Sequence, residues 1–322
     1  MSELLLKVDD LSIVYETAAG VVRAVNNVSV VIEKGKTLGL VGETGAGKTT
    51  TALGILRLLP NRTARYRNGT IEFDGQNLLT LSDKEMYGIR GRKISMVFQD
   101  PMTALNPIMN VSDQIAEAIQ FHSDGTLGRE EVDKRVSEIL ELVGIPASRK
   151  REYPHQFSGG MKQRIVIAIA LVCEPALLIA DEPTSALDVT MQAQVLAMIM
   201  DLKKRIGTSM LMISHDLGVI ARTCDDVAVM YAGEIIEMAP TDMIFTGDRH
   251  HPYTVGLMNS LPGLSGSAKR LKPIDGVMPD PTDLPAGCKF APRCPYCEER
   301  CRTEVPPCTE QNGHIVRCHR FA

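Results

Sequence analysis

The residues best suited to chemistry form a glycine-rich segment after an apolar run. Residues 38–50 read LGLVGETGAGKTT, which has the glycine, lysine and threonine spacing of a phosphate-binding loop. Glycine permits backbone conformations that turn successive N–H groups toward one anion. Lys48 can reach the β- and γ-phosphates of a nucleotide, and the Thr49 hydroxyl can ligate Mg²⁺. The predicted nucleotide contacts are Gly42, Glu43, Thr44, Gly45, Ala46, Gly47, Lys48, Thr49 and Thr50.

Two acids close a second apolar run, LLIADEP at 177–183. A buried strand that ends in acids places them at the carboxyl edge of a parallel sheet, where ligands bind in open α/β folds. Asp181 suits the Mg²⁺ shell, and Glu182 suits the polarisation of an attacking water. His215 ends a third apolar run, SMLMISH, and could contact the γ-phosphate or that water. Such residues at strand ends are often only structural, so these assignments depend on the phosphate loop.

Six of the eight cysteines lie in the last 35 residues. In a reducing compartment such a cluster indicates metal or redox chemistry before disulfides. Four thiolates can hold a 4Fe–4S cluster or a tetrahedral Zn²⁺, and the spacing matches neither the standard ferredoxin run nor a pair of zinc CxxC motifs. The spacing alone therefore leaves both metals open, with free thiols as a third possibility. The six are Cys288, Cys294, Cys297, Cys301, Cys308 and Cys318.

Strands and helices alternate around these groups. Period-two and short apolar patterns predict strands within 4–41 and at 69–73, 94–98, 176–181 and 209–215. Apolar spacings of three and four predict helices at 48–59, 111–143, 159–173 and 189–205. A strand pair is expected before Pro240, followed by a proline- and glycine-rich extended arm over 241–287. The alternation predicts an α/β protein built on a sheet with parallel strands.

Composition excludes several other classes of protein. The 322 residues include 35 lysines and arginines and 39 acids, a net charge of −4. A general nucleic-acid binder would usually be strongly basic, so no nucleic-acid partner is expected. No apolar run approaches the ~18 residues that cross a bilayer, and the N-terminal MSELLLKVDDLS lacks a signal-peptide core. The sequence therefore predicts a soluble protein that stays in the compartment where it is made.

Further motifs resemble those of a known family. HQFSGGMKQR (155–164) directly precedes the helix that leads to LLIADEPTSALD, and VFQDP (97–101) lies upstream. With the phosphate loop, these resemble the signature motif, the D-loop (SALD, 185–188) and the Q-loop of ATP-binding-cassette (ABC) ATPases, in family order across residues 4–240. The resemblance implies a P-loop NTPase fold with a mixed sheet core and a helical subdomain. It also implies that the chain binds ATP and Mg²⁺ and hydrolyses ATP.

The resemblance assigns roles to the matching residues. Tyr15 would stack on adenine, and Thr49, Gln99 and Asp181 would hold Mg²⁺. The residues implied to act on ATP held by the same chain are Lys48, Thr49, Gln99, Asp181, Glu182 and His215. The SGG motif, Ser158, Gly159 and Gly160, would form a second anion cradle at a helix start, facing ATP held by a partner ATPase subunit. One ATP would then bridge two protein surfaces, and its hydrolysis would let them separate.

A narrower resemblance covers nearly the whole chain. QDPMTALNP, RHHPYTVGLMNSLP and GCKFAPRCP…CRTEVPP are similar to the dipeptide/oligopeptide/nickel importer group. This implies an ABC nucleotide-binding domain over 1–245, with its helical subdomain at about 100–160, and a Cys-rich extension over 246–322. It also implies a peripheral motor on the cytoplasmic face of the membrane. Its partners would be two transmembrane permeases, an extracytoplasmic binding protein and a second ATPase subunit, for which the group favours a paralogue and a second copy of this chain stays open.

Several predictions about cofactor and cargo depend on this narrower resemblance. Several members of the group carry a 4Fe–4S cluster on the extension, at positions that match Cys288, Cys294, Cys301 and Cys318. A 4Fe–4S cluster is therefore favoured, with Zn²⁺ as the alternative. The expected cargo is di- or oligopeptides, with nickel or another small solute left open. A nucleotide-regulated iron–sulfur protein is the alternative from a different class, and the intact Glu182 argues against it.

Overall fold

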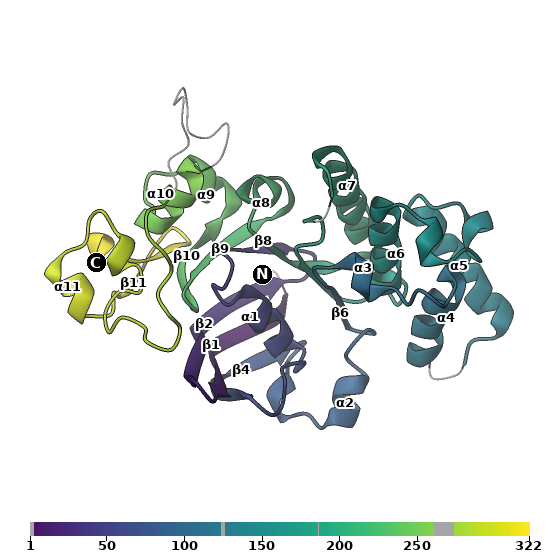
Figure 1. Cartoon of the computed structure of the whole chain (residues 1–322), viewed down its shortest axis with the longest axis horizontal. Coiled ribbons are helices and arrows are strands. Elements are labelled where there is room, and N and C mark those ends of the chain that lie inside the picture. Colours follow the sequence, from purple (N-terminus) through teal and green to yellow (C-terminus); the bar gives the residue numbers. More distant parts are fainter. Residues whose placement is uncertain (1–2, 124–125, 186, 261–273) are drawn as a thin grey trace. The chain divides into compact units, whose positions relative to one another are not determined.

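The chain folds into two compact units. The computed structural model describes residues 3–123, 126–185, 187–260 and 274–322. One unit is formed by Met1–Leu79 and Met212–Ala322 and the other by Thr80–Leu211 (Figure 1). The first unit therefore contains both the phosphate loop and the Cys-rich end of the chain. The domain limits expected from the sequence, 1–245 and 246–322, stay a prediction.

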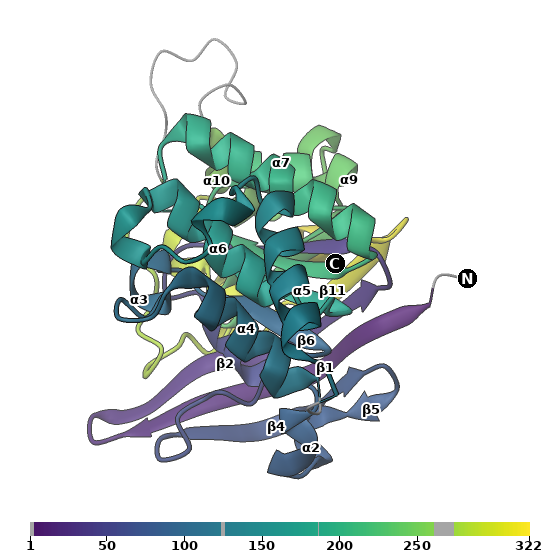
Figure 2. The ribbon, with the colours of Figure 1, turned by 90° about the vertical axis from the view of Figure 1, so that its right-hand side faces the viewer.

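The first unit contains an antiparallel sheet of four strands in the order β2-β1-β4-β5. Alternating apolar residues place one face of β1 in the core, where Leu6, Val8 and Ile13 are buried. Figure 2 shows its long strands lying side by side. The strands are β1 (Leu4–Thr17), β2 (Gly20–Glu33), β4 (Ala64–Phe73) and β5 (Gln76–Asn77).

A mixed sheet forms the rest of this unit's core. Strands β3 (Thr37–Val41) and β9 (Asp226–Tyr231) pair in parallel, and every residue of β3 is buried. Strand β10 (Glu234–Pro240) pairs antiparallel with β9, and β12 (His314–Arg317) from the end of the chain pairs antiparallel with β10. The last strand is β11 (Cys308–Gln311). The extension thus contributes two strands to the same sheet as the phosphate-loop strand.

The helices of this unit correct two expectations from the sequence. The helix after the phosphate loop ends at Ile55 rather than near 59, and Arg57 beyond it has φ +52. Residues 241–287 are not simply an extended arm, because two helices form within them. Helices of six and eight residues have too few turns to display an apolar period, and residues 261–273 lie outside the described residues. The helices are α1 (Lys48–Ile55), α8 (Leu217–Thr223), α9 (Thr241–Thr246), α10 (Pro252–Asn259) and α11 (Glu299–Thr303).

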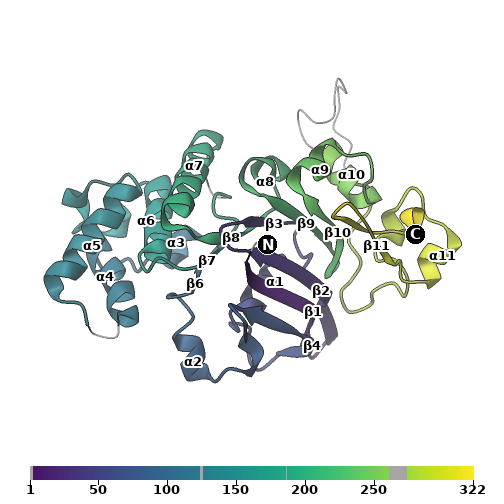
Figure 3. The ribbon, with the colours of Figure 1, turned by 180° about the vertical axis from the view of Figure 1, so that it is seen from behind.

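The second unit combines two parallel strands with a group of helices. Strands β6 (Ile94–Val97) and β7 (Leu177–Asp181) pair in parallel, and α6 packs against β6, α4 and α7 (Figure 3). The helical segment expected at 111–143 is two helices, each with an amphipathic pattern. The helices are α2 (Asp83–Tyr87), α3 (Pro101–Ala104), α4 (Val111–His122), α5 (Arg129–Leu142), α6 (Gly159–Leu171) and α7 (Val189–Ile206).

Strand β8 (Ser209–Ser214) contains the point in the sequence at which the two units divide. All six of its residues are buried, as the apolar run SMLMIS predicts. No helix among the described residues is both long and apolar enough to cross a membrane.

Candidate nucleotide-binding site

The phosphate loop leaves the buried strand β3 and leads directly into α1. At Gly47 the backbone has φ +106, and an added Cβ would lie 2.4 Å from the carbonyl oxygen of Ala24. At Gly42 a Cβ would lie 2.1 Å from the carbonyl oxygen of Met230. Only glycine fits these two positions, because both the conformation and the space exclude a side chain.

Lys48 lies over this loop. Its Nζ donates hydrogen bonds to the carbonyl oxygens of Gly42 at 2.7 Å and Glu43 at 3.0 Å, and the side chain is buried. Thr49 is exposed at the first turn of α1, where the unpaired N–H groups of a helix attract an anion. The loop therefore presents an ammonium, a hydroxyl and a helix N-terminus from adjacent residues, which suits a phosphate group.

Tyr15 lies beside the same helix start. Its hydroxyl is 3.4 Å from Oγ1 of Thr50, and its side chain is half-buried on β1. The long strand β1 thus carries an aromatic side chain to the phosphate loop, and its stacking on adenine stays a prediction. His215 lies in the same unit, exposed just after β8.

In the second unit, two predicted catalytic residues contact each other. Nε2 of Gln99 donates a hydrogen bond of 3.1 Å to Oε2 of Glu182. Asp181 is buried at the end of β7, and the next residue, Glu182, has the left-handed φ of +47. That conformation costs a residue with a Cβ about 1–2 kcal/mol. Such local strain is often found at functional sites.

The SGG motif caps the N-terminus of α6. Oγ of Ser158 accepts a hydrogen bond of 3.4 Å from the N–H of Met161, as expected of an N-cap serine. Ser158 and Gly159 are exposed, whereas Gly160 is buried against Met191. The start of this 13-residue helix is thus open to an anion brought by another molecule. Ala186 of the predicted D-loop lies outside the described residues.

Two residues of the extension that the sequence reading did not assign contact the phosphate loop. Arg293 forms a bidentate ion pair with Glu43, with N–O distances of 2.8 and 3.0 Å. The hydroxyl of Tyr253 accepts a hydrogen bond of 2.8 Å from the N–H of Glu43. Their motifs, FAPRCP and HPYT, are visible in the sequence, but nothing in the spacing connects residues separated by more than 200 positions.

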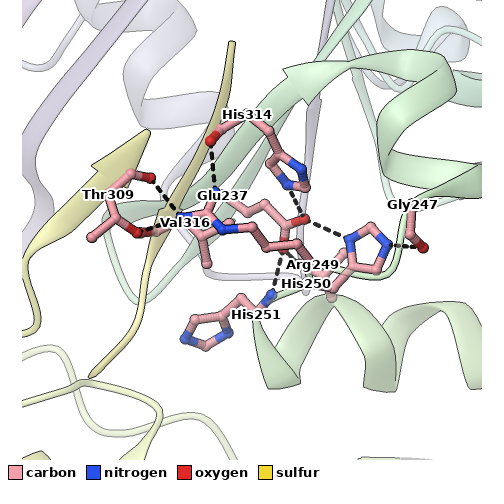
Figure 4. A network of polar contacts seen from close by, with 9 residues as sticks. Glu237, Gly247, Arg249, His250, His251, Thr309, His314 and Val316 are labelled. Carbon is pink, nitrogen blue, oxygen red and sulfur yellow. Dashed lines mark hydrogen bonds and ion pairs between the residues drawn. The ribbon is translucent and has the colours of Figure 1, made fainter. Parts of the chain in front are cut away.

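A buried charged group joins the extension to the mixed sheet. Glu237 on β10 is fully buried, and its Oε1 accepts hydrogen bonds from Nδ1 of His250 at 2.7 Å and Nε2 of His314 at 2.9 Å (Figure 4). Its Oε2 accepts from the Thr254 hydroxyl at 2.6 Å and the His251 N–H at 2.8 Å. All four donors come from residues beyond Pro240, so this carboxylate anchors the extension.

The geometry indicates the protonation state of this group. Both ring nitrogens of His250 face acceptors, namely Glu237 and the carbonyl oxygen of Gly247 at 2.9 Å, so the ring donates at both only as an imidazolium. The hydrogen bond to Glu237 raises the pKa of His250. Burial alone would raise the pKa of Glu237, but bonds from His250, His314, Thr254 and the His251 amide lower it to about 2. Three of these side chains place ligand atoms within 4.8 Å of one another, and the hydrogen bonds to Glu237 join them.

Comparison with known proteins decides the family. Residues 25–185 match the model described as ABC transporter, and residues 236–301 match the model described as oligopeptide/dipeptide transporter, C-terminal region. A probable peptide ABC transporter ATP-binding protein of Sinorhizobium fredii is 49% identical, over 99% of this chain and 96% of its own. The dipeptide transport ATP-binding protein DppD of Bacillus subtilis is 48% identical, over 98% and 94%.

The chain belongs to the ABC transporter ATP-binding family. The ADP- and phosphate-bound dimeric ATP-binding cassette MJ0796 has the same fold, with a TM-score of 0.66 and 26% identity over 73% of this chain and 98% of that one. The chain is thus an ABC ATPase coupled to transport, and the predicted P-loop NTPase fold with a mixed sheet is confirmed. These matches do not favour the alternative of a nucleotide-regulated iron–sulfur protein.

Proposed function

We propose that this chain is the ATP-hydrolysing motor subunit of an ABC importer for di- or oligopeptides. The match of residues 236–301 to the oligopeptide/dipeptide transporter C-terminal region carries the proposal, because a generic cassette would end before it. The names of the relatives agree with a peptide cargo. The motor would act at the cytoplasmic face of a membrane with two permeases, an extracytoplasmic binding protein and a paralogous second ATPase.

Both the proposed binding of ATP and Mg²⁺ and the proposed attack by water have a physical basis. Lys48 and the N–H groups of the loop would bind the phosphates of ATP, and Thr49 would ligate Mg²⁺, which neutralises charge on the phosphates. Glu182 would polarise the attacking water, and Gln99 would orient that carboxylate through the hydrogen bond described above. Asp181 would be a further ligand of Mg²⁺, and His215 would contact the γ-phosphate.

The exposed cap of α6 would act on a different nucleotide. The SGG motif, Ser158, Gly159 and Gly160, would meet ATP held by the partner subunit, so each ATP would join two subunits and its loss would release them. This assignment requires the start of the motif to be accessible, and Ser158 and Gly159 are both exposed.

The Lys48→Ala variant tests the motor. Losing a buried charged donor costs about 1.5–3 kcal/mol, so ATP affinity should fall at least about tenfold and uptake should be lost. The companion proteins are first identified by copurification from native membranes, and transport is then measured in proteoliposomes. Full ATP hydrolysis and full uptake by Lys48→Ala would refute the motor assignment.

The same preparation identifies the cargo. The copurified binding protein is titrated with dipeptides, longer peptides and Ni²⁺ by calorimetry. Peptide binding would support the proposal, whereas binding of Ni²⁺ alone would assign the motor to nickel uptake.

We further propose that Cys288, Cys294, Cys301 and Cys318 hold a 4Fe–4S cluster. The N–H of Cys288 donates a hydrogen bond of 2.8 Å to the carbonyl oxygen of Cys301, which brings two of the four positions together, and burial raises the pKa of the Cys288 thiol to about 11. Among the described residues, no three cysteine sulfurs lie within 4.8 Å of one another, whereas tetrahedral Zn²⁺ requires about 3.8 Å between sulfurs. A 4Fe–4S cluster would bind each of the four sulfurs through a different iron.

A spectrum of the purified protein tests this cofactor. Anaerobically purified protein should be brown, with broad absorbance near ~400 nm and about four iron atoms per chain. Cys301→Ser should lose the colour, and Cys308→Ser, at an exposed cysteine outside the four, should keep it. Colourless protein with one zinc per chain would reject the cluster.

A further inference from the structure

The phosphate loop carries a negative side chain that its ligand would repel. Glu43 is the first residue after Gly42, and its carboxylate lies on a loop that receives the polyanion ATP. Two like charges at short range repel each other, and the repulsion is stronger where solvent is partly excluded. The side chain is 31% exposed, so water screens it only in part. The loop therefore needs a cation to hold this carboxylate.

Arg293 of the extension supplies that cation. Its side chain is 5% exposed, and its two Nη atoms bind the two carboxylate oxygens of Glu43 in the bidentate geometry that is strongest for this pair. Its Nε donates to the carbonyl oxygen of Asp275 at 3.0 Å, and its guanidinium lies 5.8 Å from the ring centre of Tyr231. Contacts on several sides fix the guanidinium, so it can fix Glu43.

Tyr253 holds the backbone of the same residue. Its hydroxyl is the acceptor for the N–H of Glu43. Its ring is fully buried, with its centroid 4.6 Å from that of Tyr231 and 5.5 Å from that of Phe290. Tyr253 is on α10, and Thr254 next to it donates to the buried Glu237. The hydroxyl therefore has a fixed position set by the core of the extension.

A further residue of the extension approaches the loop from the other end. The Cε atom of Met278 would lie 3.1 Å from a Cβ added at Gly45. The N–H of Arg23, on β2, donates to the carbonyl oxygen of Pro281 at 2.9 Å. The extension thus approaches the phosphate loop at both Glu43 and Gly45.

We propose that Arg293 and Tyr253 are positioning residues of the ATP site, which neutralise and hold Glu43 so that ATP affinity depends on the C-terminal extension. A loop held in its binding shape before the ligand arrives loses less conformational entropy when it binds. Neither residue needs to touch ATP. The inference rests on the proposed ATPase site, but it concerns affinity and not the chemical step.

Nucleotide binding by the full chain tests this proposal. Arg293→Ala is expected to raise the Kd for ATP about tenfold, within the usual range of coupling between sites, and to raise KM in the assembled transporter by a similar factor. The kcat at saturating ATP should stay within about twofold, because Glu182 and Gln99 are unchanged. Arg293→Lys keeps the charge but loses the bidentate geometry, so its Kd for ATP should lie between those of wild type and Arg293→Ala.

Further variants separate the neutralisation of the Glu43 carboxylate from the positioning of the Glu43 backbone. Glu43→Gln in the Arg293→Ala background removes the repelling charge and should recover part of the affinity, and Tyr253→Phe removes only the acceptor of the Glu43 N–H. Arg300→Ala is the matched control, because this arginine of the extension pairs with Glu298 and the carbonyl oxygen of His319.

The outcomes are distinguishable. Unchanged Kd and KM in both Arg293→Ala and Tyr253→Phe, with at most a lower melting temperature, would reduce these residues to a structural brace and overturn the proposal. An equal loss of ATP affinity in Arg300→Ala would do the same, because the effect would then be general to the extension. Neither result would affect the motor assignment, which depends on Lys48→Ala.

Discussion

Replacing Glu182 by glutamine is expected to lower the ATPase turnover of the assembled transporter by at least about 100-fold, because general-base catalysis contributes about 10²–10⁴-fold. ATP affinity should change by less than about twofold. Glutamine has the same shape, and its carbonyl oxygen can still accept the hydrogen bond from Gln99, so only the negative charge is lost. Turnover is measured by phosphate release and affinity by calorimetry.

A matched control separates this effect from local strain. Glu174 is also a glutamate with left-handed backbone, φ +50, in the same unit, and it is exposed. Glu174→Gln should leave turnover within about twofold of wild type. If Glu182→Gln also turned over ATP at the wild-type rate, the water would be activated elsewhere and the catalytic assignment would be wrong.

The Glu237→Ala variant is expected to lose about 3–5 kcal/mol of stability, because removing one partner of a buried ion pair leaves the other uncompensated. The protonated ring of His250 would lose its counter-ion, and three further donors would lose their acceptor. For a unit of this size the melting temperature should fall by on the order of 10 °C. Calorimetric melting checks this, and Glu310→Ala, an exposed acid on β11, should stay within about 0.5 kcal/mol.

The stability that this network contributes should depend on pH. It should be lost at low pH through Glu237 and at higher pH through His250. Because the pKa of Glu237 is lowered from 4.5 to about 2, its contribution is present above about 4.5 and is lost as pH falls toward 2. Because the pKa of His250 is raised above 6.5, its contribution is present below 6.5 and is lost as pH rises through the raised value. The difference in melting temperature between wild type and Glu237→Ala should therefore be largest between about pH 4.5 and 6.5. A difference independent of pH would contradict the charged pair.

The fold was predictable where local pattern and tertiary environment agree. The buried strands β3, β7 and β8 are short apolar runs, and the phosphate loop between β3 and α1 follows from glycine spacing. The helices α9 and α10 were missed, because they are short and one begins with the proline that suggested a loop. Pro252 suits the first turn of a helix, where its missing N–H has no partner to lose.

The candidate site was predictable to the same extent: features within one segment were visible in the sequence, whereas contacts between distant segments were not. Residue type and spacing indicated Lys48 and Glu182, and the family resemblance indicated the SGG motif, because each of these features lies within one segment of the sequence. The contact of Gln99 with Glu182 and that of Arg293 with Glu43 join residues 83 and 250 positions apart. Only the packed chain determines such pairs, since a single sequence shows what a side chain can do and not what it meets.

The sequence by itself indicated the candidate chemistry of this protein: a phosphate loop, an acid suited to activating water, a helix cap and a set of clustered thiols. Those are local properties, because glycine freedom, charge and helix capping act over a few residues. The tertiary structure alone decided that the extension joins the sheet of the phosphate loop and holds Glu43 through Arg293 and Tyr253. That arrangement depends on strand pairing and burial over the whole unit, where favourable packing outweighs any local preference.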